Sequence, residues 1–212
     1  MSRKILENEL EDLQFDILRM GSHVEKAISD SVKALLNDDL ALANEVIEAD
    51  DLIDQLNIAV QDKCIRLLAL RNPMATDLRI IETDLQIATD LERMGDYAES
   101  IARIAVRLHG RRTIPQLAHL NRLADMVKDL VHNIVTAYIL GDISLAKEVV
   151  DMEEKVDGHY KEYFEIVLQL IKEDPNTAEM GIQLLFAGHN LERIADHSTN
   201  IGESVFYMIT GV

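Results

Sequence analysis

Four pairs of carboxylates, each spaced four residues apart, are the part of this sequence best suited to chemistry. The pairs are Asp50 with Asp54, Glu92 with Asp96, Glu153 with Asp157, and Glu192 with Asp196. Residues at i and i+4 lie on the same face of a helix, so each pair would hold two carboxylates side by side. Carboxylate oxygens with little sulfur or imidazole nearby suit hard or borderline cations such as Mg²⁺, Mn²⁺, Ca²⁺ and iron. These residues therefore predict metal sites carried on helices.

The occurrence of the pairs in two matching halves carries more weight than any single pair. Because 38 of the 212 residues are acidic, roughly seven pairs at this spacing would arise by chance. However, residues 46–54 align with residues 149–157 at an offset of 103, and residues 91–96 align with residues 191–196 at an offset of 100. The pairs thus fall at equivalent places in two copies of one unit. Facing pairs would repel each other unless a cation offsets their charge, and a site with several acids could bridge more than one ion.

Glu99 is a further candidate ligand because it follows Glu92 by seven residues and so lies on the same helix face. Its counterpart is Thr199, and we therefore expect the second site to differ from the first. Asp51 and Glu154 flank the pairs and are alternatives that could bind from the side. The full set of predicted metal ligands is Asp50, Asp54, Glu92, Asp96, Glu99, Glu153, Asp157, Glu192 and Asp196.

Histidine and arginine residues stand beside the acidic pairs. His197 follows Asp196, but Tyr97 occupies the equivalent position in the first copy, so we expect His197 to have a packing or surface role instead of binding metal. Arg93 and Arg193 each follow a glutamate of a pair. Pairing with an acid of a neighbouring helix and simple exposure to solvent are equally compatible with their position.

Apolar residues that recur every three or four positions predict helices along the whole chain. The predicted helices cover about 6–36, 40–70, 76–109, 116–140, 143–172 and 177–208, and the breaks between them contain Asp, Asn, Gly or Pro. Short connections make successive helices antiparallel. We expect an all-α fold, an elongated tandem repeat of two antiparallel three-helix bundles with six helices related by a pseudo-twofold axis. The first repeat spans 1–110, the linker 111–115 and the second repeat 116–212.

Three residues inside these predicted helices need a separate explanation. Gly95 and Gly188 lower helix propensity by about 1 kcal/mol relative to alanine, and a close approach of another helix would explain them. Cys64 is the one cysteine, so it forms no internal disulfide, and no C-x-x-C motif surrounds it. We expect it to be a small buried apolar residue.

The net charge and the hydropathy of the chain limit the kinds of partner and the location that we expect for it. The formal charge of -17 argues against nucleic acid, because Lys and Arg supply the affinity for phosphate backbones, and it favours a basic or metal-bearing partner. The N-terminus turns acidic where a signal peptide would be apolar, and no stretch approaches the ~18 apolar residues of a membrane span. We therefore expect a cytoplasmic protein without direct membrane insertion, which reaches the membrane through its partners.

Two acidic segments, one in the predicted helix 76–109 and one in the predicted helix 177–208, resemble the paired signature of the PhoU family of phosphate-uptake regulators. The segments are Leu91-Glu92-Arg93-Met94-Gly95-Asp96 and the run from Asn190 to Glu203, and residues 72–79 resemble the family's turn between its second and third helices. The similarity covers essentially the whole chain. The two repeats differ at two places within this pattern. The first repeat has Tyr97 where the second has His197, and it has Glu99-Ser100 where the second has Thr199-Asn200. These differences put the equivalence of the two metal sites in question.

This resemblance implies a regulatory adaptor without catalysis. It implies multinuclear metal clusters on the acidic pairs, with iron or zinc foremost and manganese or magnesium as alternatives. It also implies that the chain couples the ATPase of a phosphate ABC transporter to a sensor histidine kinase, as a negative regulator of the phosphate-starvation response. We further expect a homodimer, and we expect metal to neutralise each acidic face and set its shape for a partner.

Two other functions remain open at this point. A carboxylate-bridged di-iron enzyme would also be helical and acidic, but it needs Glu-x-x-His on two helices. None of the seven histidines follows a glutamate by three, and only Asp129 before His132 comes close. The second alternative is a metal-free helical adaptor whose acids face water or meet basic partner surfaces.

Overall fold

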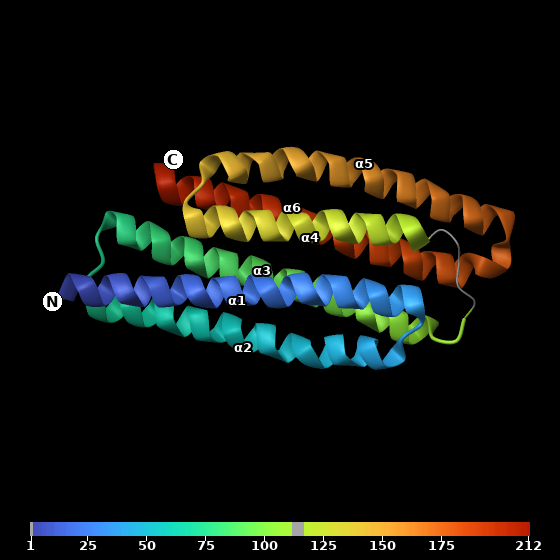
Figure 1. Cartoon of the computed structure of the whole chain (residues 1–212), viewed down its shortest axis with the longest axis horizontal. Helices are drawn as coiled ribbons and strands as arrows, with labels where there is room; N and C mark the ends of the chain where they lie inside the picture. The colour runs from blue at the N-terminus through green and yellow to red at the C-terminus, as the bar shows by residue number, and fades with distance from the viewer. Residues whose placement is uncertain (1, 112–116) are drawn as a thin grey trace.

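The structure, a computed structural model, describes residues 2–111 and 117–212 and consists of long antiparallel helices (Figure 1). The elements in chain order are α1 (Ser2–Asn37), α2 (Leu40–Arg71), α3 (Ala75–Leu108), α4 (Leu117–Leu140), α5 (Ile143–Glu173), the 3-10 turn η1 (Pro175–Thr177) and α6 (Ala178–Thr210). The all-α class and the six helices predicted from the sequence are confirmed. Most of the predicted linker, 111–115, and the predicted start of the second repeat at 116 lie outside the described residues.

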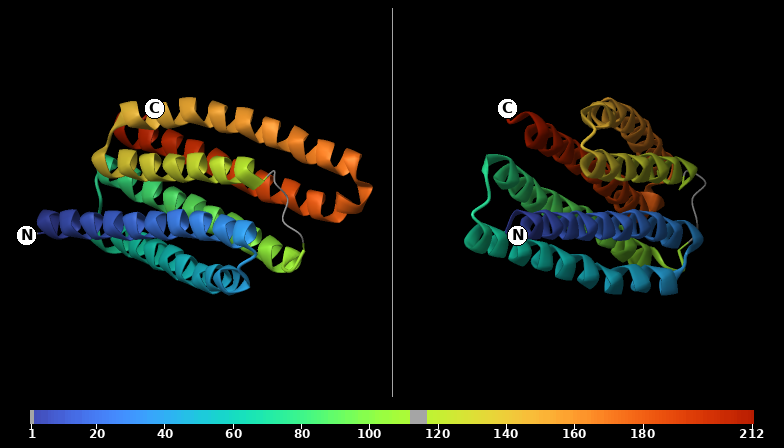
Figure 2. Two further views of the ribbon diagram at one scale, coloured as in Figure 1. Left: turned by 45° about the vertical axis from the view of Figure 1, so that its right-hand side comes forward. Right: turned by 60° about the vertical axis from the view of Figure 1, so that its left-hand side comes forward.

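The six helices form two layers. Helices α2, α3, α6 and α5 lie side by side in that order, and α1 and α4 pack across them, α1 against α2 and α3 and α4 against α5 and α6 (Figures 1 and 2). Helix α1 also contacts α4. The three helices of each half therefore form a bundle, and the two bundles meet along α1 with α4 and α3 with α6.

The core follows from the apolar spacing. The helix α1 residues Leu13, Ile17 and Met20 are fully buried, and the buried residues of all six helices form one continuous cluster. Cys64 belongs to that cluster, as its sequence context predicted. Ala49 falls in the apolar spacing of α2, but it is exposed. The buried face of α2 therefore lacks this residue.

Matching polar residues begin the second helix of each repeat. The Asp39 side chain accepts a hydrogen bond from the backbone N of Leu42, and the Asp142 side chain accepts from the backbone N of Ser144 and Leu145. Such caps stabilise a helix start by about 1 kcal/mol. They fix where α2 and α5 begin, and so they set the positions of the acidic pairs that follow.

The contact between α3 and α6 shows the pseudo-twofold relation of the repeats. Gln86 on α3 pairs with Ser204 on α6, and Asp90 pairs with His197, so the two equivalent helices run antiparallel against each other. Within residues 2–111 and 117–212, no helix combines the length and the apolar composition that a bilayer crossing demands.

Candidate metal centre

The first acidic cluster forms where α2 and α3 come close together. A Cβ atom placed on Gly95 of α3 would lie 2.9 Å from Asp50 Oδ1 and 3.0 Å from Ile53 Cδ1 of α2. Gly188 marks a similar approach in the second repeat, since its Cβ would lie 2.5 Å from Tyr163 Cε1 on α5. Both glycines therefore occupy close helix contacts, which accounts for their cost in helix propensity.

Three of the predicted ligands meet at this contact. One carboxylate oxygen from each of Asp50, Asp54 and Asp96 lies within 4.8 Å of the other two. Asp50 and Asp54 come from successive turns of α2, and Asp96 comes from the facing turn of α3. The i, i+4 spacing and the antiparallel packing thus assemble an all-oxygen group, which is the kind of donor set that hard divalent cations prefer.

The electrostatics of this cluster are unfavourable in the absence of a cation. Burial, followed by the negative charges of Glu99 and Asp54, raises the pKa of Asp50 to about 7. Burial and neighbouring carboxylates also raise the pKa values of Glu92 and Asp96 above their ordinary range. Among the described residues, the three aspartates have no ion pair shorter than 3.7 Å: Arg93 Nη1 lies 3.7 Å from Asp96 Oδ2, and Arg103 is bound to Glu99.

Glu92 and Glu99 lie beside the three aspartates, and Glu99 is also bound to an arginine. Burial is the main cause that raises the pKa of Glu92, and the charges of the neighbouring Asp96 and Asp54 raise it further. Glu99 faces Asp50 closely enough to raise the pKa of that carboxyl, yet its Oε1 accepts a hydrogen bond from Arg103 Nη2 at 2.5 Å. Glu99 could therefore bind a cation through its Oε2, or through both oxygens after release from Arg103.

The second cluster joins the two acidic pairs of α5 and α6 but carries its own cations. Burial, Asp157 and Asp196 raise the pKa of Glu153, so residues from both helices face one another. Arg193 Nη1 contacts Asp196 Oδ2 at 2.6 Å, and Lys161 Nζ lies 3.7 Å from Asp157 Oδ2.

Glu192 completes the second cluster. Burial and the charge of Asp196 raise its pKa, and His189 Nδ1 lies 3.1 Å from its Oε2. Among the described residues, only the first cluster brings three carboxylate oxygens within 4.8 Å of one another. The two clusters therefore differ in geometry as well as in sequence.

The flanking residues take other positions. Asp51 and Glu154, the alternatives for binding from the side, are both exposed. Arg93 and Arg193 contact acids of their own helices, and the neighbouring Tyr97 of α3 raises the pKa of Arg193.

His197 connects the two repeats. Its Nδ1 lies 2.7 Å from Asp90 Oδ1 on α3, and its ring lies 5.7 Å from that of Tyr97, measured between centroids. Both the His197 and the Asp90 side chains are largely buried. This position is the packing role expected for His197, and the partner Asp90 could not be identified from the sequence.

A buried polar group in the core was also missed by the sequence patterns. Asp84 of α3 is fully buried, and its Oδ1 accepts a hydrogen bond from the Tyr138 hydroxyl of α4. Its Oδ2 is buried without a hydrogen-bond partner among the described residues. Burial raises the pKa of Asp84 to about 7. The position of Asp84 in the apolar spacing between Ile81 and Ala88 was the available indication.

Comparisons with known proteins agree with this architecture. A PhoU domain profile matches residues 17–105 and again residues 120–205. The chain is 39% identical over its full length to the phosphate-specific transport system accessory protein PhoU homolog of Clostridium acetobutylicum, of which it covers 97%. It is 32% identical over 96% of its length to the accessory protein PhoU of Escherichia coli K12, of which it covers 84%.

Solved structures show the same fold. The crystal structure of PhoU from Pseudomonas aeruginosa superposes with a TM-score of 0.93 at 35% identity, with 97% of this chain and 99% of that chain covered. The phosphate transport system regulatory protein PhoU from Streptococcus pneumoniae superposes with a TM-score of 0.89 at 30% identity, with 98% of each chain covered.

Proposed function

The chain belongs to the PhoU family, and we propose that it holds the phosphate-starvation response off by coupling the ATPase of a phosphate ABC transporter to a sensor histidine kinase. The family consists of regulatory accessory proteins of phosphate transport, so the chain is a regulator and not an enzyme. The full-length similarity to accessory proteins of the phosphate-specific transport system supports a role in phosphate uptake. We place it at the cytoplasmic face of the membrane through these partners.

The observation that carries the mechanistic part of this proposal is the group formed by Asp50, Asp54 and Asp96. Their oxygens lie within 4.8 Å of one another, and Asp50 in particular has a raised pKa. A bound cation would supply the positive charge that this group lacks, and the all-oxygen donor set fits manganese, magnesium or iron better than a soft metal. Zinc also accepts carboxylate ligands. Glu92 and Glu99, whose charges raise the pKa of Asp50, are the candidates to extend this group to a larger cluster.

The second cluster offers an independent set of donors for the same role. Glu153, Asp157, Glu192 and Asp196 converge from α5 and α6, and the charges of Arg193 and Lys161 already compensate part of their repulsion. Cation binding at either cluster would neutralise an acidic face and fix the relative position of two helices. Metal occupancy would in this way be linked to partner binding.

Metal analysis with a matched pair of variants tests this proposal. The protein would be purified without chelator and without a nickel affinity tag, and its metals counted by plasma mass spectrometry. The test variant replaces Asp54, Asp96, Asp157 and Asp196 by Asn. The control variant makes the same change at four exposed aspartates outside the pairs, Asp12, Asp62, Asp125 and Asp129.

We expect the wild-type and control proteins to carry metal and to bind the purified ATPase and kinase, and the test variant to lose both properties. Loss of metal with unchanged partner binding would leave the regulatory role intact but remove its link to metal. Absence of metal from all three proteins, with partner binding retained, would make the chain a metal-free helical adaptor. That the chain forms a homodimer stays a prediction, which analytical ultracentrifugation checks.

A further inference from the structure

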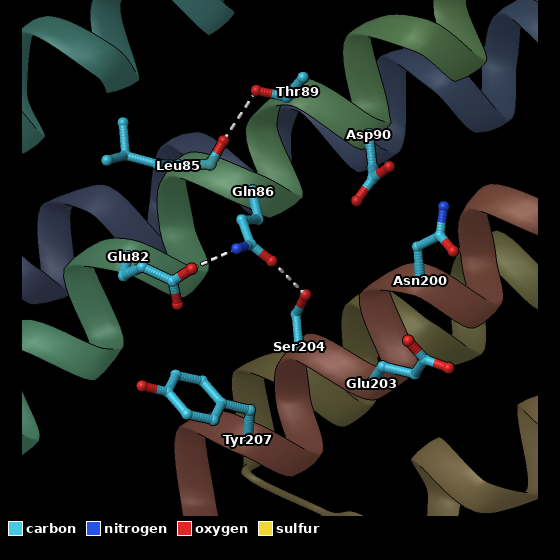
Figure 3. A pocket seen from close by; sticks show the side chains of 9 residues that line it. All are labelled: Glu82, Leu85, Gln86, Thr89, Asp90, Asn200, Glu203, Ser204 and Tyr207. Atoms are coloured by element: carbon cyan, nitrogen blue, oxygen red, sulfur yellow. Dashed lines mark hydrogen bonds between the residues drawn. The ribbon is translucent and has the colours of Figure 1, made fainter. Parts of the chain in front are cut away.

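A groove between α3 and α6 lies outside the acidic clusters. It has a volume of about 810 Å³ and is lined by Glu82, Gln86 and Asp90 of α3 and by Glu203, Ser204 and Tyr207 of α6, among others (Figure 3). The Ser204 hydroxyl donates a hydrogen bond to Gln86 Oε1 at 2.9 Å, and Gln86 in turn donates to Glu82. The Ser204 to Gln86 bond joins the two helices across the groove, and the Gln86 to Glu82 bond lies within α3.

A second, apolar groove continues the first over α2 and α3. It has a volume of about 740 Å³, shares Glu82, Leu85 and Tyr207 with the first, and adds Leu68 of α2 and Leu78 of α3. Leu68, Leu78 and Tyr207 are 41%, 44% and 41% exposed, although large apolar side chains gain free energy on burial. One continuous groove therefore presents an apolar floor beside an acidic rim.

The length of this groove matches a helix. Its lining on α3 runs from Ala75 to Asp90, which at about 1.5 Å per residue is about 22 Å. A partner helix of about 15 residues would span it. Helices that bind grooves place apolar side chains at i, i+3, i+4 and i+7 on the floor and polar side chains toward the rim.

The charge of the lining selects the partner. Glu82 and Glu203 form no ion pair in the described part of the chain, and Asp90 is paired with His197. Arg79, near the C-terminus of α6, is the one cation among the lining residues that the structure describes. A second copy of this chain would bring further negative charge, since the net charge is -17. Lys and Arg on the partner helix would complement the rim.

We propose that this continuous groove of α2, α3 and α6 docks a basic amphipathic helix of a partner protein. The proposal goes beyond the regulatory function assigned above because it names a surface and a partner chemistry that do not depend on metal. Glu82 and Glu203 select the basic flanks of the helix, and Leu68, Leu78 and Tyr207 receive its apolar side.

Designed peptides test the proposal by fluorescence anisotropy. The probe is a small library of labelled helical peptides of about 15 residues, with Leu or Phe on one face and Lys and Arg on its flanks. An acidic library carries Glu at every Lys and Arg position. The rim variant is Glu82→Gln with Glu203→Gln, and its control is Glu45→Gln with Glu148→Gln, two exposed glutamates without ion pairs in the described residues. The floor variant is Leu78→Ser.

We expect basic peptides to bind wild type and the control alike, and the rim and floor variants to bind roughly tenfold more weakly. Circular dichroism would verify that all variants fold, and chelator in every sample would separate this result from metal binding. Equal binding by the rim and control variants, binding of the acidic peptides, or failure of every basic peptide would each overturn the proposal. A change in oligomeric state in the floor variant without an effect on peptide binding would instead identify a contact between copies of the chain.

Discussion

Asp50 Oδ1 lies 2.9 Å from the point that a Cβ atom on Gly95 would occupy. The absence of a side chain at this one position on α3 lets a carboxylate of α2 approach the helix backbone. Asp96, the next residue of α3, then reaches the same group of oxygens. The geometry of the first cluster therefore depends on a residue that carries no ligand atom.

Replacement of Gly95 by Ala should weaken metal binding without unfolding the protein. The new Cβ would displace the ends of two side chains, Asp50 and Ile53, while alanine improves helix propensity by up to about 1 kcal/mol. We expect the affinity of the first cluster for Mn²⁺ to fall roughly tenfold to a hundredfold, measured by calorimetry. The control is Gly158→Ala in α5, whose Cβ meets nothing within 4 Å. Equal affinity in both variants would show that Gly95 does not position Asp50.

Asp84 should make the protein less stable as the pH rises. Its folded-state pKa is about 7, above an ordinary value near 3.8, so the native state binds more protons than the unfolded state between these values. The contribution of Asp84 to the free energy of unfolding is therefore most favourable below the unfolded-state pKa, where the carboxyl is protonated in both states. This contribution is lost as the pH rises toward 7. For this group the slope is at most about 1.4 kcal/mol per pH unit.

The variant Asp84→Asn isolates this effect because its side chain stays neutral. Urea unfolding in the presence of chelator, between about pH 5 and pH 8, gives the free energy of unfolding of both proteins. As the pH rises, we expect the free energy of unfolding of the wild type to fall relative to that of the variant. Above the folded-state pKa of Asp84 the difference should become constant. A difference independent of pH would mean that Asp84 is ionised throughout.

His197 and Asp90 should stabilise the contact between the repeats and contribute nothing to metal binding. Their side chains are largely buried and 2.7 Å apart, and a charged hydrogen bond of this kind contributes about 1 to 3 kcal/mol. A double-mutant cycle of His197→Ala and Asp90→Ala, measured by urea unfolding, should give a coupling energy in that range. Metal content should be unchanged in His197→Ala. Loss of metal in that variant would instead identify His197 as a ligand.

The helices and the acidic pairs could be predicted from the sequence because both are local patterns. Apolar residues spaced by three and four positions mark the buried faces, and Asp39 and Asp142 begin equivalent helices in the two repeats. The pairs at i and i+4 needed only the helix itself to bring two carboxylates together. The similarity between the two halves then indicated that the pairs belong to equivalent sites.

The partners of these side chains could not be predicted, because they depend on contacts between distant helices. The Asp90 to His197 contact joins residues 107 positions apart, and nothing in either segment alone marks it. Glu99 shares a face with Glu92 but turns toward Arg103, one turn further on. The rotamer of a side chain such as Glu99 depends on which nearby charged group it pairs with. The spacing of residues in the sequence does not show which pair forms.

The two clusters should therefore bind cations with different affinities, the first more tightly. A cation at the second cluster must displace Arg193 from Asp196, at 2.6 Å, and compete with Lys161 and His189. At the first cluster Arg103 is bound to Glu99, the closest cation to the three aspartates in the described residues is Arg93 at 3.7 Å from Asp96, and three aspartate oxygens already converge. Titration with Mn²⁺, followed by the electron paramagnetic resonance of the free ion, should resolve two classes of site.

Paired variants assign these classes to the two clusters. Asp54→Asn with Asp96→Asn should remove the tighter class, Asp157→Asn with Asp196→Asn should remove only the weaker one, and Arg193→Gln should strengthen the weaker class by freeing Asp196. Circular dichroism of Arg193→Gln is needed as a control, because Arg193 also lies near Tyr97 of α3. Equal losses in the two double variants would show that the internal cations do not determine affinity. In that case the converging carboxylates alone would set the strength of both sites.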